Sequence, residues 1–429
     1  MLDIKQIREQ TKQVKENLTR RKDPELLKKL DQVVKKDEKY RQTLYQVEKL
    51  RHEKNDKSQE INQLKKEKKD IKKTILEVRK VTQTLAEKEQ ELIKLKQELT
   101  QQLMRLPNIM HESVPYGKDD TENKEIRKWG KPKKFDFEIK NHGELAEQLG
   151  IADFERSAKI SGKGFYFMLG DLTMLNQALI RYGLEKLMKK GFTPVEPPEM
   201  MRRKPYEGVT DLADFENMIY KSEGEDQYFI ATSEHPIAAM LMDESISEEK
   251  LPLKFAGLSI NFRKEIGSHG VDEKGFFRMH QFWKVEQLIF CKPEDSWKIH
   301  EEIIKNAEEI YQELDLPYHV VNICTGDLGI VAAKKYDLEV WMPRTKEYKE
   351  VVSCSNCTDY QARRLNIKCR DKYGNNRTLH TLNSTAIATS RTLVAILENY
   401  QNKDGSITIP TVLQKYMNGK KKITTQKII

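Results

Sequence analysis

Apolar residues follow a helical period through the first quarter of the chain, at alternating spacings of four and three positions. Residues with this spacing lie along one face of an α-helix, and that face must pack against another helix to leave water. The pattern therefore predicts a coiled coil. Its apolar positions are Leu26, Leu30, Val33, Tyr40, Leu44 and Val47, followed by Ile61, Leu64, Ile71, Ile75, Val78, Leu85, Leu92, Leu99, Leu103 and Leu106.

Neither Gly nor Pro interrupts the chain between Glu25 and Leu106. Two arrangements fit this segment: one helix of about 120 Å, or an antiparallel hairpin of two helices of about 57 Å each. The hairpin is preferred because it buries the apolar positions within a single chain. We expect its turn within Lys65-Lys-Glu-Lys-Lys-Asp70, the densest charge cluster of the segment.

The pattern changes after Pro107. Short apolar runs separated by Gly and Pro alternate there with helical stretches, which is typical of a mainly antiparallel sheet with helices packed on it. We therefore predict an α+β protein with a coiled-coil arm at 1–106, a linker at 107–130 and a larger domain at 131–429. The expected strands include 165–169, 228–231, 287–290 and 338–342, and the expected helices include 172–190, 300–313 and 392–400.

Positive charge is concentrated in the predicted arm. Residues 1–106 carry 29 Lys and Arg against 19 Asp and Glu, whereas the rest of the chain carries 47 against 48. A domain with this surplus suits a polyanionic partner, and nucleic acid is the first candidate. The alternative is a scaffold coiled coil with a lysine-rich surface, and charge alone does not separate the two.

Two classes of protein are excluded by the sequence. No apolar run approaches the ~18 residues of a membrane-spanning helix, and Met1-Leu-Asp-Ile-Lys-Gln6 lacks the basic-then-apolar order of a signal peptide. The five cysteines, an odd number, cannot form a complete disulfide framework, which fits a reducing compartment. We therefore expect a cytoplasmic protein with no membrane partner.

Candidate chemistry lies in three segments of the larger domain. The sequence lacks Gly-x-x-x-x-Gly-Lys-Ser/Thr, a Gly-x-Gly-x-x-Gly after a strand, and His-Glu-x-x-His. A nucleotide would then need arginines on strands and helix ends, with an acidic residue for magnesium. The segments are 261–287, where a strand carrying Arg263 and Glu265 on one face precedes a loop with Gly267, Gly270 and Gly275; 348–358, with Glu350 and Ser353 as a magnesium ligand pair; and 382–391, a run of small residues leading to Arg391.

These segments resemble the signature motifs of class II aminoacyl-tRNA synthetases. Gly191-Phe-Thr-Pro-Val-Glu-Pro-Pro198 is similar to motif 1, Phe262-Arg-Lys-Glu265 through Glu286 to motif 2, and Asn383 through Arg391 to motif 3. Ala231-Thr-Ser-Glu234 and Ser353-Cys-Ser-Asn-Cys-Thr-Asp-Tyr-Gln-Ala-Arg-Arg364 are similar to segments of the seryl members. The whole chain thus resembles the seryl-tRNA synthetase family, of the ordinary archaeal and eukaryotic type. Motif 3 departs from the usual Gly-x-Gly, because Ser384-Thr-Ala386 precedes Arg391.

The resemblance implies an activity and a role for each motif residue. The protein would activate L-serine with ATP and Mg²⁺ to seryl-adenylate and transfer serine to tRNA(Ser), with tRNA(Sec) as a further substrate. Arg263 would bridge the serine carboxylate and the α-phosphate, Glu265 and the Met279 backbone would contact adenine, and Arg391 would lie over adenine near the γ-phosphate. The serine-binding residues would be Thr232, Ser233, Glu234, Arg263, Glu286, Asn383 and Thr385. The ATP-binding residues would be Arg263, Lys264, Glu265, Met279, Phe282, Glu350, Val351, Val352, Ser353 and Arg391, with Mg²⁺ on Glu350 and Ser353.

The resemblance also implies partners. Motif 1 would form the interface of a homodimer within a class II catalytic domain, and the arm of one subunit would bind tRNA at the active site of the other. Two alternatives are an inactive synthetase fold in an interaction protein and a ligase that loads a carrier protein. The motif residues argue against the first, and the long arm argues against the second. Zinc is not expected, because Cys354 and Cys357 are followed only by Cys369 and His380 at irregular spacing.

Overall fold

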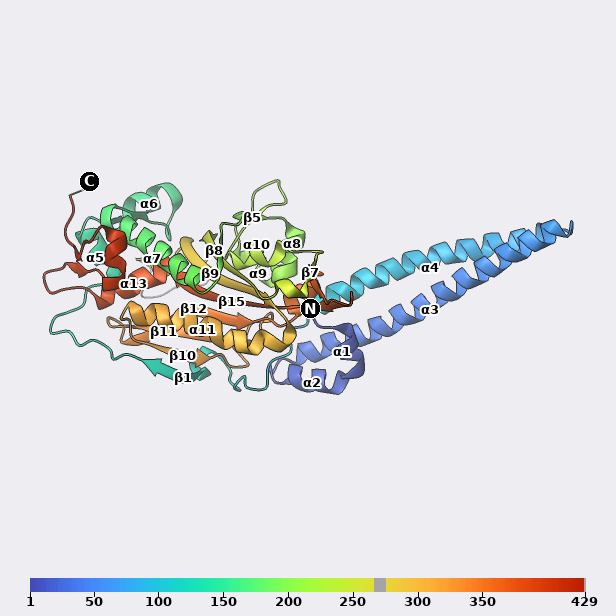
Figure 1. The fold of residues 1–429 in the computed structure, drawn as a ribbon, viewed down its shortest axis with the longest axis horizontal. Coiled ribbons are helices and arrows are strands. Elements are labelled where there is room, and N and C mark those ends of the chain that lie inside the picture. Colours follow the sequence, from blue (N-terminus) through green and yellow to red (C-terminus); the bar gives the residue numbers. More distant parts are fainter. Residues whose placement is uncertain (266–274, 428–429) are drawn as a thin grey trace. The chain divides into compact units, whose positions relative to one another are not determined.

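The computed structural model describes residues 1–265 and 275–427 and divides the chain into two compact units, Met1–Ile109 and Met110–Ile429 (Figure 1). The first unit is helical, and its two long helices pair as the predicted antiparallel hairpin. The first long helix begins after Asp23, whose side chain accepts the backbone N–H of Glu25. Pro24 occupies the first helical position, where proline is favoured because its missing N–H would have no partner within the helix. The helices are α1 (Ile4–Glu9), α2 (Thr11–Thr19), α3 (Pro24–Lys66) and α4 (Lys72–Met104).

The hairpin turns within the predicted charge cluster, between the end of α3 and the start of α4. Lys68 takes the left-handed conformation with φ of 54°, the position at which many helices end on glycine. The Asp70 side chain then accepts the backbone N–H of Lys72 at 2.9 Å and begins the next helix. A turn without glycine is therefore built from a left-handed lysine and an aspartate.

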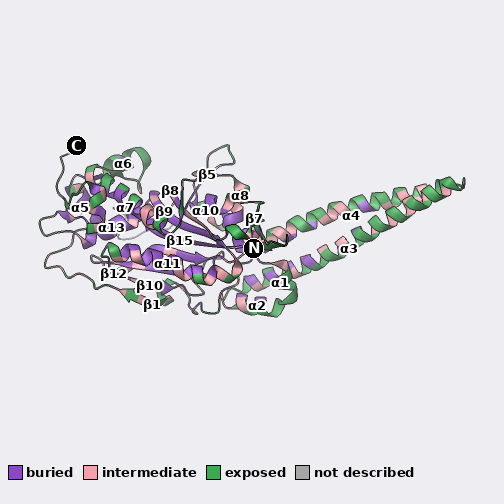
Figure 2. Cartoon of the chain, viewed as in Figure 1, coloured by how far each residue is buried: buried purple, intermediate pink, exposed green. Residues whose placement is uncertain are grey.

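Single buried positions recur along α3 and α4, and the residues between them are exposed or intermediate (Figure 2). The buried apolar residues include Leu26, Leu30, Val33, Val47, Leu85, Leu99 and Leu103, all of which the period predicted. Ion pairs link the two helices beside this seam, and their partners run in opposite directions along the chain, as antiparallel helices require. These pairs are Lys36–Glu98, Lys39–Glu91, Arg51–Glu89 and Lys57–Glu77.

The second unit is built on a mixed but mainly antiparallel sheet in which only the edge pair β4 and β8 is parallel. The expected α+β class is thus confirmed. In spatial order the strands are β1 (Lys124–Trp129), β10 (Tyr318–Asn322), β11 (Lys334–Met342), β12 (Glu347–Asn356), β15 (His380–Ala388), β9 (Gln281–Cys291), β8 (Leu253–Phe262) and β4 (Thr193–Val195).

Side chains of the central strand β9 alternate between the two faces of this sheet. Val285 and Ile289 pack with the helices α7 (Gly170–Lys189), α11 (Ser296–Glu313) and α13 (Thr389–Asn399). Leu288 and Phe290 pack in a second apolar cluster with α8 (Arg203–Val209), α10 (Glu234–Ala239) and α12 (Tyr360–Arg364). The even-numbered positions of β9 therefore share the face covered by α8, α10 and α12.

Several elements differ in extent from those predicted. The segment 107–130 contains η1 (Asp120–Glu122) and β1, and β1 pairs with β10, so part of the predicted linker belongs to the sheet. The central strands are longer than the apolar runs that predicted them, because polar positions continue the ladder. The remaining elements are α5 (His142–Gln148), β2 (Ala152–Asp153), α6 (Phe154–Ser161), β3 (Phe167–Met168), β5 (Met200–Met201), α9 (Leu212–Phe215), η2 (Glu216–Met218), β6 (Tyr228–Phe229), β7 (Ser245–Ser247), η3 (Glu248–Lys250), η4 (Pro293–Asp295), β13 (Lys368–Arg370), β14 (Asn376–Thr378), β16 (Ile407–Thr408), α14 (Thr411–Gln414), η5 (Lys415–Met417) and β17 (Lys422–Ile423).

Candidate active site

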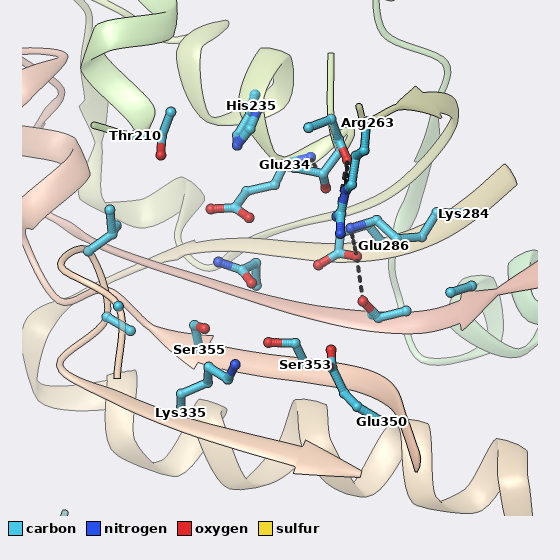
Figure 3. A pocket seen from close by; sticks show the side chains of 18 of the residues that line it. Thr210, Glu234, His235, Arg263, Lys284, Glu286, Lys335, Glu350, Ser353 and Ser355 are labelled. Atoms are coloured by element: carbon cyan, nitrogen blue, oxygen red, sulfur yellow. Dashed lines mark hydrogen bonds and ion pairs between the residues drawn. The ribbon is translucent and has the colours of Figure 1, made fainter. Parts of the chain in front are cut away.

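A cavity of about 560 Å³ lies on the α8, α10 and α12 side of the sheet. Its floor comes from β9, β11, β12 and β15, and its walls come from residues 209–211, the start of α10 and residues 327–332 (Figure 3). The floor is unusually polar for the middle of a sheet. Charged residues from three of these strands, together with Asn383 and Thr385 from β15, line one cavity, which is the arrangement expected of a ligand site.

Glu286 stands at the centre of this floor. The Thr385 hydroxyl donates to its Oε2 at 3.0 Å, and the Lys284 ammonium lies 2.8 Å from the same oxygen. Glu286 and Lys284 share a face because β9 alternates, and Thr385 is the direct cross-strand partner of Glu286 on β15. These three side chains present a hydroxyl, a carboxylate and an ammonium to one point of the cavity.

Arg263 enters the cavity from the end of β8. Its Nε and Nη2 donate to the Ala231 carbonyl at 3.3 and 3.2 Å, and its guanidinium carbon lies 5.2 Å from the centre of the Phe282 ring. Burial and the nearby Arg391 guanidinium lower the pKa of Arg263, while Glu265, Glu350 and Glu286 oppose them. The carbonyl and the ring fix the side chain, so its charge is held in place before any ligand binds.

A β-bulge in β12 brings Glu350 and Ser353 onto the same face. Residues three apart in a regular strand point to opposite faces, but the pairing with β11 shifts at Val351, so that Val352 pairs with Leu338 and Glu350 with Glu339. Both Glu350 and Ser353 therefore line the cavity (Figure 3).

Arg391 holds Glu350 in its charged form. Its Nη1 donates to the Glu350 backbone carbonyl at 2.8 Å and lies 3.2 Å from the Glu350 carboxylate. Burial would raise the pKa of Glu350, but Arg391 and Lys335 outweigh it and lower that pKa to about 2. The Glu350 side chain is still 41% exposed, so an ionised carboxylate remains open to a ligand.

Glu234, at the start of α10, forms a second acidic position in the wall. Burial, aided by the Glu286 charge, raises the pKa of Glu234 to about 7, although the Gln361 amide donates to its Oε1 at 2.8 Å. The neighbouring His235 is held neutral, because burial lowers its pKa to about 3. A carboxylate that ionises near neutral pH is suited to a cationic ligand group.

Comparison with known proteins shows the family of the chain. Two family models match it: the seryl-tRNA synthetase N-terminal domain over residues 1–110, and the tRNA synthetase class II core domain (G, H, P, S and T) over residues 215–400. The serine--tRNA ligase of Methanocella arvoryzae is 58% identical over 98% of this chain and 99% of its own length. The chain belongs to the seryl-tRNA synthetase family.

Solved structures of two seryl-tRNA synthetases share the fold. The crystal structure of the Pyrococcus horikoshii enzyme complexed with ATP superposes with a TM-score of 0.94, at 49% identity, over 100% of both chains. The cytoplasmic serine-tRNA ligase of Naegleria fowleri in complex with AMP gives a TM-score of 0.89 at 37% identity, over 100% of this chain and 99% of its own. The family and fold class expected from the motifs are therefore confirmed.

Most residues implied by the seryl-tRNA synthetase motifs line this one cavity. They come from β8, β9, β12, β15, α10 and α13 or from the segments beside them. The lining residues among them are Thr232, Glu234, Arg263, Glu265, Met279, Phe282, Glu286, Glu350, Val351, Ser353, Asn383, Thr385 and Arg391.

Three implied residues do not line the cavity. Ser233 is buried and its hydroxyl donates to the Gly257 carbonyl at 3.3 Å. The Lys264 ammonium lies 5.8 Å from the Tyr220 ring centre. Val352 packs into the hydrophobic core, because the bulge turns Val351 and not Val352 toward the cavity.

The strand that was expected to carry Arg263 and Glu265 ends earlier. The last residue of β8 is Phe262, and Glu265 has a left-handed backbone with φ of 45°, so strand alternation does not place these two residues. The predicted glycines Gly267 and Gly270 lie outside the described residues, whereas Gly275 approaches His142 closely.

Lys284 and Lys335 line the cavity but were not among the predicted site residues. Lys284 could have been found, because it lies between Phe282 and Glu286 and shares their face by the period of two. Lys335 lies 3.1 Å from Asp337 on β11, and its position depends on the pairing of β11 with β12. No local pattern in the sequence indicates that pairing.

The cysteines do not form part of a metal-binding cluster. Among the described residues, no group of three or more His, Cys, Asp or Glu is placed to hold a metal ion. Cys354 and Cys357 are buried, and burial raises the pKa of both thiols well above the usual value. A neutral buried thiol packs as a small apolar group. In the described part of the chain, no helix is long and apolar enough to span a membrane.

Proposed function

We propose that this protein is a serine–tRNA ligase that forms seryl-adenylate from L-serine and ATP and transfers serine to tRNA(Ser). The observation that carries the proposal is the place of Arg263. Its charge interacts with Glu286 on one side of the cavity and with the Arg391–Glu350 pair on the other. A fixed cation between an amino acid site and a nucleotide site is what carboxylate attack on a phosphate requires.

Serine would bind at the Glu234 and Glu286 end. Its carboxylate would pair with Arg263, its ammonium with Glu234 and Thr232, and its hydroxyl with Glu286 and Thr385. The Lys284 ammonium lies 2.8 Å from the Glu286 carboxylate, so the two buried charges form a pair. Asn383 completes this end of the cavity, where its amide also lies 3.8 Å from the Cys357 sulfur.

ATP would bind at the other end, where Phe282 offers a ring for stacking and Arg391 a cation for the phosphates. The ionised Glu350 and the Ser353 hydroxyl fit Mg²⁺, because this ion takes one or two protein oxygens and fills its other positions with phosphate and water. When bound, Mg²⁺ supplies positive charge to the phosphates. The two relatives crystallised with ATP and AMP support a nucleotide site in this fold.

The reaction follows from this arrangement. One serine carboxylate oxygen attacks the α-phosphorus, a new P–O bond forms, and the bond to the β-phosphate oxygen breaks to release pyrophosphate. No general base is required, because the attacking carboxylate is already ionised at neutral pH. Arg263 would hold both reacting groups and offset the charge that builds up on the α-phosphate oxygens.

The homodimer is part of this proposal, supported by two exposed apolar side chains on α7, the helix that precedes motif 1. Met174 and Met188 lie on α7 with Gln177 and Arg181, spaced along one helical face, and the two methionines are 44% and 53% exposed. Phe167 on β3 is 38% exposed, and β4 leaves one sheet edge unpaired within the described chain. Exposed apolar residues beside a free strand edge favour association of two copies.

The arm is proposed to bind tRNA through its basic surface. Lys65, Lys66, Lys68, Lys69, Lys72 and Lys73 are all exposed at the turn of the hairpin. Such a cluster suits phosphates. No residue of the chain described here distinguishes tRNA(Sec) from tRNA(Ser), so the proposal names tRNA(Ser), and tRNA(Sec) is a second substrate to be assayed.

ATP–pyrophosphate exchange with each of the twenty amino acids tests the proposal. Serine should support exchange far better than any other amino acid, and charging of tRNA(Ser) should follow. Exchange that depends on a different amino acid, or on none, would contradict it.

A further inference from the structure

The helix α12 carries two side chains that reach the wall of the cavity without being part of the reacting centre. Gln361 and Arg364 belong to the segment that resembles the seryl enzymes, but no role has yet been assigned to either. Gln361 is fully buried and bonds to residues of α8, α10 and β15, and Arg364 bonds to backbone carbonyls at the end of α8.

Gln361 uses both ends of its amide. Its Nε2 donates to Glu234 Oε1 at 2.8 Å and to the Val209 carbonyl at 3.1 Å, and its Oε1 accepts from the Thr381 hydroxyl at 2.7 Å. Two acceptors on the nitrogen and a hydroxyl on the oxygen define the orientation of the amide. Gln361 therefore fixes one oxygen of Glu234, and the carboxylate can present its other oxygen to a ligand.

Arg364 holds the backbone on both sides of Val209, the residue whose carbonyl Gln361 contacts. Its Nη1 donates to the Glu207 and Thr210 carbonyls at 3.1 and 2.9 Å, and its Nη2 donates to the Tyr360 hydroxyl at 3.0 Å. The last carbonyls of α8 have no partners within the helix. A cation there is favoured both by hydrogen bonds to these carbonyls and by the negative end of the helix dipole. Gln361 and Arg364 together cap α8 and hold residues 209–211 as a cavity wall.

We propose that Gln361 and Arg364 are positioning residues that set the geometry of the serine end of the cavity, Gln361 through Glu234 and Arg364 through the 209–211 wall. The inference rests on the proposed function, because it assigns serine to this end. Neither side chain bonds to Arg391, Glu350 or Phe282 among the contacts described, so the nucleotide end should be unaffected by their loss.

The Gln361 hydrogen bond also bears on the charge of Glu234. Glu286 and Lys284 face Glu234 from β9, Arg263 from the end of β8, Cys357 from the segment after β12 and Gln361 from α12. The N–H of Gln361 favours the ionised carboxylate, so its removal raises the pKa of Glu234 further above its ordinary value. Because the serine ammonium would bind the ionised form, the acid limb of kcat/KM for serine should then move to higher pH.

Steady-state ATP–pyrophosphate exchange on the full-length protein tests this role. Gln361→Met keeps the size of the side chain but removes the donor. We expect the KM for serine to rise about 10-fold or more, as for loss of a hydrogen bond to a charged group. The KM for ATP should stay within about 2-fold of the parent. The acid limb of the pH profile of kcat/KM for serine should move to higher pH by roughly 0.5 unit or more.

Arg364→Met should also raise the KM for serine, and Arg364→Lys should recover part of the loss, because an ammonium can still bond one carbonyl. The matched control is Arg363→Met on the same helix, since Arg363 pairs with Asp359, the residue just before α12, at 2.5 Å. This variant should keep both KM values within about 2-fold of the parent.

Three outcomes would overturn the inference: an unchanged KM for serine in Gln361→Met, a parallel rise in both KM values, or an acid limb that does not move. The second outcome would show a general structural role, and thermal melting of each variant identifies it. A parent protein that shows no serine-dependent exchange at all refutes the proposed function instead. The two failures are therefore distinct.

Discussion

Replacing Arg263 by alanine removes a side chain whose charge interacts with Glu286 and with Glu350 and Arg391 alike. The change leaves the Ala231 carbonyl without its two N–H donors and uncovers the Phe282 ring. Neither group is charged, so the fold should tolerate the loss. The reacting centre should not, because serine carboxylate and α-phosphate would meet without a cation between them.

The size of the effect follows from how Arg263 is held. Two hydrogen bonds to one carbonyl and a ring contact fix the guanidinium, so it needs no rearrangement when charge builds up on the phosphate. Removal of one such preorganised donor costs a factor of about 10²–10³ in rate. Arg263 would serve two reacting groups, and we therefore expect at least the upper end of this range in kcat/KM for exchange.

Serine-dependent ATP–pyrophosphate exchange measures this loss directly. Arg127→Ala is the matched control, because it removes another partly buried arginine of the same sheet. Arg127 lies on the edge strand β1 and pairs with Glu308 of α11. The control should lower the melting temperature while exchange stays within a few-fold of the parent. Exchange by Arg263→Ala within a few-fold of the parent would refute the role assigned to Arg263.

Three further outcomes are expected. Glu286→Ala should weaken serine activation and reduce the serine-to-alanine ratio of kcat/KM by about tenfold or more, since a buried polar site rejects substrates that leave it unpaired; an unchanged ratio would place hydroxyl recognition elsewhere. Glu350→Gln should raise the Mg²⁺ concentration for half-maximal exchange about tenfold, whereas Glu347→Gln, exposed on the same strand, should not. Deleting residues 40–90 and joining Lys39 to Glu91, which are ion-paired at 3.4 Å, should leave exchange intact but lower tRNA charging about 100-fold and flatten its salt dependence. Charging at the parental rate would make the arm a scaffold.

The coiled-coil arm could be predicted almost completely from the sequence, because its rules are local. The seven-residue apolar period, the absence of glycine and proline, and the charge cluster at the turn all act within a few residues. The seam residues Leu30, Val33 and Leu99 are buried as the period requires. Local rules did not indicate how the turn is made, since Lys68 adopts a conformation that lysine seldom takes.

The sequence predicted only those site residues that strand alternation or the family motifs indicate. Glu286 and Thr385 share a face across two strands, and both were identified. The bulge at Val351 could not be inferred, because it depends on the pairing of β12 with β11, and it decides that Val351 rather than Val352 meets the cavity. The contacts of Gln361 with Val209 and Glu234 could not be inferred either, since they join residues more than 100 positions apart.

The charges that line the cavity bear on how charged substrates would bind there under the proposed function. In the structure the buried or half-buried charges are already paired, Lys284 with Glu286, Arg391 with Glu350, and Lys335 with Asp337. Bringing an unpaired ion into such a site would cost several kcal/mol. Under the proposed function, a charged group of the substrate that binds next to one of these pairs would replace an existing ionic contact with a new one. Arg263 differs from these pairs, because its N–H groups donate to a neutral carbonyl. Its full charge is therefore left for the serine carboxylate and the α-phosphate, which are the two groups that react.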